Sequence, residues 1–477
     1  MPKRNTETTE KARRPLKDKS YWVFVPMVRV SRRPFIWFFR VLRAFSEVSV
    51  LMAVGPAHAQ ILPYQAKGQN LGVVNCANSL CHGSVASWKD SNILQNEYVT
   101  WSRVDKHATR AYHVLLEERS QRIARNLGIK EPAHQAKLCL DCHAYNPPPA
   151  QRGERFKVAD GVSCEACHGP SENWIRTHVS PGATHADNVK QGLYPTNEPL
   201  AQARLCLSCH FGNSDKFVTH RMMGAGHPRM SFELDTFAQT QPPHFVIDAD
   251  WERRKGRWDS VRVWAIGQAL AASELLDVLL DPKRSRDGLF PELVVFDCHA
   301  CHHPMSDVRW SPRTNTSPGR IRLNDANLLM LRQIVRRTLP PEEANAFSQR
   351  VTELHKAVAG DGGDAIEAAK ALRATLDAVA AQLARREFAA DDLRAMAMGL
   401  VDDGAAGQYR DYAGAEQATM AVGSLLNFLA KRGQVDARGA NAAMDRLLDT
   451  VKNDEKYRPE RFQSALEEVG RILGKGK

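Results

Sequence analysis

The sequence predicts a mainly α-helical protein with two regions of different composition. Residues 60–314 hold all ten cysteines, fifteen of the seventeen histidines and several turn-rich stretches, so we expect little regular structure there beyond short helices. Residues 315–477 have no cysteine or tryptophan and are rich in Ala, Leu, Arg and Glu, with apolar residues at helical spacing. This second region is therefore expected to form a helical bundle.

Residues 1–59 are expected to be a signal peptide. An apolar run at 48–55 precedes Ala57-His58-Ala59, whose small-x-small pattern is typical of a cleavage site. The segment before Met27 is too long for the usual basic start of a signal, so we expect translation to begin at Met27. The alternative is an uncleaved membrane anchor, although charged residues interrupt its apolar run. We therefore expect export to the periplasm, with membrane anchoring as the alternative.

The ten cysteines form five short strings, and each string ends in a histidine. A disulfide framework would give no reason for a histidine after every second cysteine. The strings are Cys76-Ala-Asn-Ser-Leu-Cys81-His82, Cys139-Leu-Asp-Cys142-His143, Cys164-Glu-Ala-Cys167-His168, Cys206-Leu-Ser-Cys209-His210 and Cys298-His-Ala-Cys301-His302.

This spacing is typical of covalent haem attachment. Two thiols must reach two vinyl groups on one edge of a porphyrin, and the next residue then points an imidazole at the iron. The first string has four intervening residues, but Cys81-His82 keeps the local geometry, so we count it as a fifth site. Zinc binding or thiol redox chemistry is the alternative, disfavoured because the strings use every cysteine. The sequence predicts five covalently bound haem c groups, with proximal ligands His82, His143, His168, His210 and His302.

The second axial ligands are less fully specified by the sequence. The best candidates are His107, His178, His220 and His227. Weaker candidates are His113, His134, His185 and His244, with Met222, Met223 and Met305 as alternative soft ligands. His299 lies inside an attachment string, and His303 follows a proximal ligand, so it could reach only a neighbouring iron.

Helical spacing also predicts individual helices. Apolar residues at 258–280 indicate one long helix, which Asp281-Pro282 ends. In the second region we expect helices near 324–338, 341–358, 363–385, 389–401, 414–431, 438–452 and 458–473. Clusters such as Gly360-Asp-Gly-Gly363 and Asp402-Asp-Gly404 are expected to separate some of them. This region carries no chemical motif, so we interpret it as a packing or partner-docking module.

Several strings resemble those of the c-554-type multihaem cytochromes, which are related to hydroxylamine oxidoreductase. They are Trp101-x3-Asp105-x-His107-Ala, Leu127-Gly-Ile, Cys139-Leu-Asp-Cys-His143-Ala, Gly161-Val-Ser-Cys-Glu-Ala-Cys-His-Gly-Pro170, Cys206-Leu-Ser-Cys-His210, Thr219-His220 and Ala225-Gly-His-Pro228. The resemblance covers about residues 70–310 and omits the tail. It implies haems stacked in close pairs that shuttle electrons, and it supports His107 and His178 as distal ligands. Relatives commonly carry a histidine where this chain has Trp174, which leaves one ligand assignment open.

The fold class is thus a multihaem cytochrome c domain, 60–314, followed by an α-helical domain, 315–477. The strings favour an exported electron carrier over an enzyme. The alternative is an oxidoreductase that acts on hydroxylamine, nitric oxide or nitrite at one five-coordinate haem, although the sequence has no Cys-x-x-Cys-Lys string. The net charge of +11 suggests redox partners that are acidic or membrane-associated, or a larger complex. No nucleic-acid-binding module is found.

Overall fold

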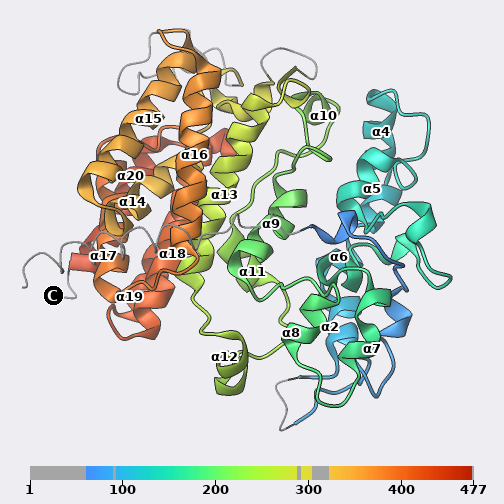
Figure 1. Cartoon of the computed structure of the whole chain (residues 1–477). Coiled ribbons are helices and arrows are strands. Elements are labelled where there is room, and N and C mark those ends of the chain that lie inside the picture. Colours follow the sequence, from blue (N-terminus) through green and yellow to red (C-terminus); the bar gives the residue numbers. More distant parts are fainter. Residues whose placement is uncertain (1–60, 90–92, 287–291, 303–321, 475–477) are drawn as a thin grey trace, which may run out of the picture. The chain divides into compact units, whose positions relative to one another are not determined.

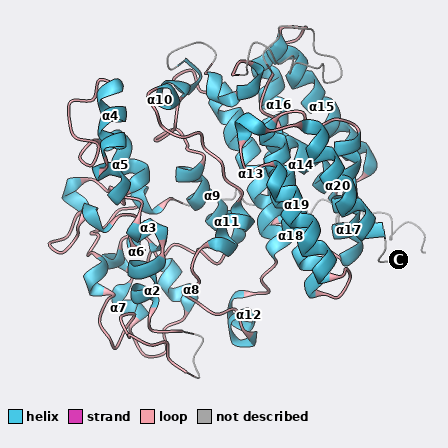
Figure 2. Cartoon of the chain, turned by 180° about the vertical axis from the view of Figure 1, so that it is seen from behind, coloured by secondary structure: helices cyan, strands magenta, loops and turns pink. Residues whose placement is uncertain are grey.

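The computed structural model describes residues 61–89, 93–286, 292–302 and 322–474, all within the compact unit Gln60–Lys477. The described part contains helices, loops and three isolated bridges, and no β-strand (Figure 2). The predicted mainly α-helical fold class is therefore confirmed. The predicted signal peptide, 1–59, lies outside the described residues.

Helices in the cysteine-rich region are short, and the longest before residue 257 has twelve residues. They are α2 (Glu97–Val104), α3 (Lys106–Thr109), α4 (Glu118–Asn126), α5 (Lys137–His143), α6 (Cys164–His168), α7 (Ile175–His178), α8 (His185–Lys190), α9 (Pro199–His210), α10 (His220–Gly224), α11 (Leu234–Thr240) and α12 (Ala249–Lys255). The 3-10 turns are η1 (Pro63–Gln65), η2 (Val73–Asn75), η3 (His113–Leu116), η4 (Pro149–Gln151), η5 (Val158–Asp160), η6 (Ser171–Asn173), η7 (Arg284–Arg286), η8 (Leu293–Val295), η9 (Cys298–Ala300) and η10 (Asp454–Lys456). This matches the short helices expected there.

The long helix predicted at 258–280 is α13 (Ser260–Leu280). The side chain of Asp259 caps it by accepting a hydrogen bond from the Val261 amide at 2.9 Å. Fifteen of its 21 residues are buried. Within the described residues it is the one helix long and apolar enough to cross a membrane, but protein already covers most of it, as in a core helix.

The described part of the C-terminal region, residues 322–474, contains seven α-helices, and the apolar spacing predicted all seven. They are α14 (Ala326–Thr338), α15 (Pro341–Ala359), α16 (Ala365–Leu383), α17 (Ala390–Ala405), α18 (Tyr412–Lys431), α19 (Ala437–Thr450) and α20 (Pro459–Gly474). Their boundaries are confirmed to within a few residues.

One predicted separator was wrong, because α17 continues through Asp402-Asp-Gly404. Asp403 is buried there and accepts a hydrogen bond from Gln333 Nε2 at 2.6 Å. Gly404 lies against α20, where a Cβ atom would come within 2.5 Å of Leu466 Cδ2. Tertiary packing therefore explains both residues, and they do not break the helix.

Helix α13 joins the two regions. It packs against α14, α16 and α18 of the bundle, as Figure 1 shows for α16 and α18, and also against α9 and α11. One hydrophobic cluster extends from Ala203 and Leu207 on α9 to Leu473 on α20. The helix that carries the fourth cysteine string is therefore packed on the bundle core. The boundary at 314/315 stays a prediction.

Candidate functional site

Each cysteine string forms a single helical turn or a bulged variant of one. The second, third and fourth strings end α5, α6 and α9 at His143, His168 and His210. Residues at i, i+3 and i+4 share one face of a helix, so both sulfur atoms and the imidazole lie on the same side. None of the ten cysteines is paired in a disulfide, so all ten sulfur atoms are available for attachment to another group.

The first and fifth strings close in the same way in spite of their different lengths. The His82 amide donates to the Cys76 carbonyl at 3.1 Å, and the His302 amide donates to the Cys298 carbonyl at 2.8 Å. The two extra residues of the first string form a bulge. Gly83 packs on this bulge so closely that a Cβ atom would lie 1.8 Å from the Ala77 carbonyl oxygen. The longer first string thus ends in the same Cys-His turn as the others, and this turn positions the imidazole of His82.

Four of the five proximal imidazoles face a second imidazole across a nearly constant gap. Two imidazoles that share one metal have centres roughly 6 Å apart, since each nitrogen lies about 2 Å from the metal and each ring centre about 1 Å further out. Each of the four best distal candidates of the sequence prediction belongs to one of these pairs. The pairs and their centre-to-centre distances are His82–His178 at 6.0 Å, His210–His107 at 6.1 Å, His302–His220 at 6.1 Å and His143–His227 at 6.3 Å.

Hydrogen bonds orient several of these rings. In four of the eight, Nδ1 contacts an acceptor, which leaves Nε2 for a metal. Metal-ligating histidines usually donate their other ring N–H to such an acceptor, which fixes both tautomer and orientation. The contacts are His82 Nδ1–Glu97 Oε2 at 2.9 Å, His107 Nδ1–Asp105 Oδ1 at 3.0 Å, His143 Nδ1–Ala111 O at 2.8 Å and His227 Nδ1–Pro228 O at 2.7 Å.

Asp105 and Glu97 contact rings of these pairs, and the sequence prediction did not include either among its site residues. Burial alone would raise the pKa of Asp105, but hydrogen bonds from the side chain and amide of His107 outweigh it and lower the pKa to about 2. Burial also opposes ionisation of Glu97, while the hydrogen bond from His82 lowers its pKa. The Asp-x-His spacing could have revealed Asp105, because that carboxylate also caps α3.

His168 is arranged differently from the other proximal imidazoles. No ring contact joins it to another imidazole in the part of the chain that the structure describes. Burial lowers the pKa of His168 to about 3, and His244 makes the largest charge contribution. His244 was one of the weaker candidates, and it lies between α11 and α12. Trp174 is buried and packs edge-on against His178, with ring centres 5.6 Å apart.

The remaining predicted ligands have other surroundings. The ring of His113 packs edge-on against Tyr112, with centres 6.3 Å apart. Nε2 of His185 contacts Asn197 Oδ1 at 2.8 Å, while Nδ1 of His134 is buried without a hydrogen-bond partner. His299 contacts Tyr412, with ring centres 6.1 Å apart. His303 and Met305 lie outside the described residues.

The cysteine-rich region has too little core of its own to hold these rings. Its separate apolar cluster contains five buried residues, of which three are alanines. Of the sixteen exposed large apolar side chains in the described part, fourteen lie between Ile61 and Ile247. Apolar surface of this kind indicates a binding site, and porphyrins would cover it. In contrast, the described residues contain no group of three or more His, Cys, Asp or Glu that could hold zinc.

The cysteine strings also contact one another in pairs. The thiols of Cys76 and Cys164 lie close enough to shift each other's pKa, and so do those of Cys142 and Cys209. The first string is thereby adjacent to the third, and the second to the fourth.

Glu165, inside the third string, holds the first contact in place. This buried carboxylate accepts hydrogen bonds from the amides of Leu71 and Gly72 at 2.8 Å each, just before the first string. It also accepts from the amide and hydroxyl of Ser171, at 2.9 and 2.6 Å. Sequence reasoning missed this role, because the intervening residues of such a string are not fixed by the attachment chemistry.

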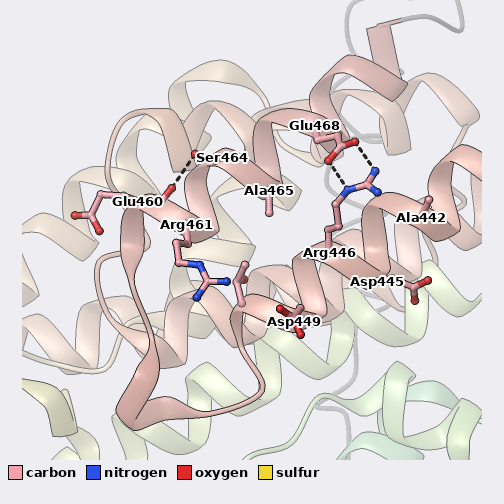
Figure 3. Close-up of a pocket in the computed structure, with 10 residues that line it drawn as sticks. Ala442, Asp445, Arg446, Asp449, Glu460, Arg461, Ser464, Ala465 and Glu468 are labelled. Atoms are coloured by element: carbon pink, nitrogen blue, oxygen red, sulfur yellow. Dashed lines mark hydrogen bonds and ion pairs between the residues drawn. The ribbon is translucent and has the colours of Figure 1, made fainter.

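An open hollow of about 800 Å³ lies between α19 and α20 (Figure 3). Charged residues line most of it, and Arg446 forms an ion pair with Glu468 at one end. None of its lining residues belongs to a cysteine string or an imidazole pair, so it has no part in the site described above.

Comparison with known proteins identifies one segment of the chain. The family model described as cytochrome c554 and c-prime matches residues 75–169. The match includes the first three cysteine strings and is narrower than the resemblance seen over about 70–310. No curated protein and no solved structure matches the chain.

Proposed function

We propose that the chain is a c-type electron-transfer cytochrome similar to the cytochrome c554 and c-prime family, whose model matches residues 75–169, and that it carries five covalently bound haems. Each of the five cysteine strings would supply two thioether bonds and one proximal imidazole. The observation that carries the proposal is the set of four imidazole pairs with centres 6.0–6.3 Å apart.

The distal ligands in this proposal are His178, His107, His227 and His220, opposite His82, His210, His143 and His302 respectively. Haem iron, when bound, supplies a one-electron couple. In these four pairs the chain would hold two imidazoles on one iron, which would favour low-spin iron and lower potentials than a Met/His pair. Contact between the first and third strings, and between the second and fourth, supports transfer from site to site within the chain.

A mass spectrum of the mature protein from a cytochrome-maturing host tests the haem count. We expect the mass of five haems above that of the chain, and free thiols should be absent. Replacing Cys76 and Cys81 with serine should remove one haem, which checks the four-residue string. A wild-type mass with four haems or fewer would contradict the proposal.

A second candidate function rests on His168, because no imidazole among the described residues is in ring contact with it. If His244 does not bind the third iron, that iron has an open face, and the protein could act on hydroxylamine, nitric oxide or nitrite. Carbon monoxide added to the reduced protein separates the two functions. An unchanged Soret band supports the carrier with His244 as fifth distal ligand, whereas binding to one haem supports the enzyme.

Export and partners are further parts of the proposal. The small-x-small pattern before Gln60 supports a cleaved signal and a periplasmic location, with redox proteins as partners. N-terminal sequencing of the exported protein should begin at Gln60. Recovery of an intact 35–54 segment would instead favour a membrane anchor.

A further inference from the structure

Three of the imidazole pairs differ in what their Nδ1 atoms contact. In the His82–His178 and His210–His107 pairs, one ring contacts a carboxylate, from Glu97 or Asp105. In the His143–His227 pair, both rings contact main-chain carbonyl oxygens instead. The imidazole pairs of the first and fourth strings therefore each have a carboxylate on one ring, whereas the rings of the second-string pair contact neutral carbonyl oxygens.

Resting on the function proposed above, we propose that Glu97 and Asp105 are positioning residues that lower the reduction potentials of the haems held by the first and fourth strings. A carboxylate that accepts the Nδ1 proton makes the imidazole a stronger donor to iron. Its negative charge also favours the ferric state, which carries one more positive charge than the ferrous state.

Burial makes the effect larger at Asp105 than at Glu97. The Asp105 side chain is 5% exposed and that of Glu97 is 17% exposed, so water screens the Asp105 charge less. Gln241 Nε2 donates to the second oxygen of Asp105 at 3.1 Å, and the His107 amide donates to the first at 2.9 Å. These contacts fix the carboxylate beside the ring.

An opposite charge faces the same haem from its thioether edge. Lys216 Nζ lies 2.9 Å from Cys209 Sγ in the fourth string, donates to the Asp141 carbonyl at 2.9 Å and lies over the Tyr64 ring. This ammonium group favours the ferrous state and so raises the potential that Asp105 lowers. Asp105 and Lys216 thus have opposite effects on the reduction potential of the fourth haem, and replacing each of them should shift this potential in opposite directions.

Spectroelectrochemical titration of the full-length matured protein tests the proposal. Asp105→Asn keeps an oxygen that can accept from His107 and can cap α3, but it loses the charge. We expect one redox component to shift to a more positive potential, and Lys216→Met should shift the same component to a more negative one. Glu97→Gln should shift a different component upward by less. In Asp105→Asn the low-spin g-values of one haem should change as well. Asp105→Glu keeps the negative charge, so its reduction potential should lie closer to the wild-type value than that of Asp105→Asn.

Glu117→Gln is the matched control, because this exposed carboxylate bonds to Arg110 at 3.0 Å and to no imidazole. Equal shifts in this control, or unchanged components in both Asp105→Asn and Glu97→Gln, would overturn the inference. The haem count of each sample keeps the two proposals distinct. Five haems with unshifted potentials refute the tuning alone, whereas fewer haems in the wild type refute the proposed function.

Discussion

At the residue scale, single buried carboxylates decide how the cysteine strings are held. Glu165 binds four donors that belong to two separate segments, so it joins the first string to the third without any apolar core between them. An ionised carboxylate is suited to this role, since its two oxygens offer about four acceptor positions.

Replacing Glu165 with glutamine should destabilise the protein strongly. The amide nitrogen of glutamine would face N–H donors, and each buried donor left unpaired costs about 1–3 kcal/mol. We expect a clearly lower thermal midpoint, measured by circular dichroism. The neighbouring Glu172→Gln is the control, because Glu172 accepts from the Gln69 amide in a more exposed contact. Equal midpoints for the two variants would contradict the role assigned to Glu165.

Glu233 gives the stability a specific pH dependence. Burial and repulsion from Asp235 raise the pKa of Glu233 to about 7 from an ordinary value of 4.5. Between these values the folded chain binds more protons than the unfolded chain. The stabilisation is thus present below pH 4.5 and is lost as pH rises through 7. The unfolding free energy of the wild-type protein should decrease between pH 4.5 and 7, and this decrease should be smaller in Glu233→Gln. An identical slope in the two proteins would show that Glu233 does not titrate in this range.

At the element scale, α18 clamps the segment that leads from α10 to α11. Glu416 accepts from Arg229 at 2.8 Å and from the Ser231 hydroxyl at 2.7 Å. The next residue of that segment, Phe232, stacks on the proximal imidazole of His210 with centres 4.4 Å apart. The bundle therefore supports the fourth site directly.

Replacing Glu416 with glutamine should loosen this clamp. Charged hydrogen bonds of partly buried groups contribute about 1–3 kcal/mol, so we expect a loss of that order in unfolding free energy. The change should also disturb the spectrum of one haem. Glu353→Gln, on an exposed site of α15, should alter neither property. A stability loss without any spectral change would mean that the clamp does not support His210.

Sequence patterns predicted elements better than contacts between them. The seven bundle helices follow from local apolar spacing, whereas the continuation of α17 depends on Gln333 and Leu466, which lie far away in the chain. For the same reason, the sequence could not show which proximal histidine each of the four best distal candidates faces, and their role as ligands stays a prediction. Glu97 and Glu165 were missed because nothing in the local sequence distinguishes them from glutamates on the surface.

At the scale of the whole molecule, the two regions differ in what stabilises them. The bundle and α13 share a large apolar core, while the cysteine-rich region has one small cluster and many exposed apolar side chains. Most of the net charge of +11 comes from residues 1–60. This segment contains twelve of the 65 basic residues but only four of the 54 acidic residues. A mature chain that begins at Gln60 is close to neutral, so its charge gives little support for acidic partners.

When the protein is produced without haem attachment, the bundle should therefore fold while the cysteine-rich region stays unfolded. We expect limited proteolysis to cut within residues 61–257 and to spare α13 and the bundle helices α14 to α20, with fragments identified by mass spectrometry. The fully matured protein, treated in parallel, should resist cleavage in both regions. Equal protection of both regions without haem would show that the cysteine-rich region has a sufficient core of its own.

Because α9 packs on the bundle core, haem attachment at the fourth string should precede the folding of the bundle. Cys206 packs against that core, so an attachment enzyme could not easily reach its thiol once the bundle has closed. The bundle helices follow the last cysteine string in the chain, so in an exported chain they would emerge after it. In that order every thiol would stay accessible until haem attachment, and the closing of the bundle would then cover Cys206.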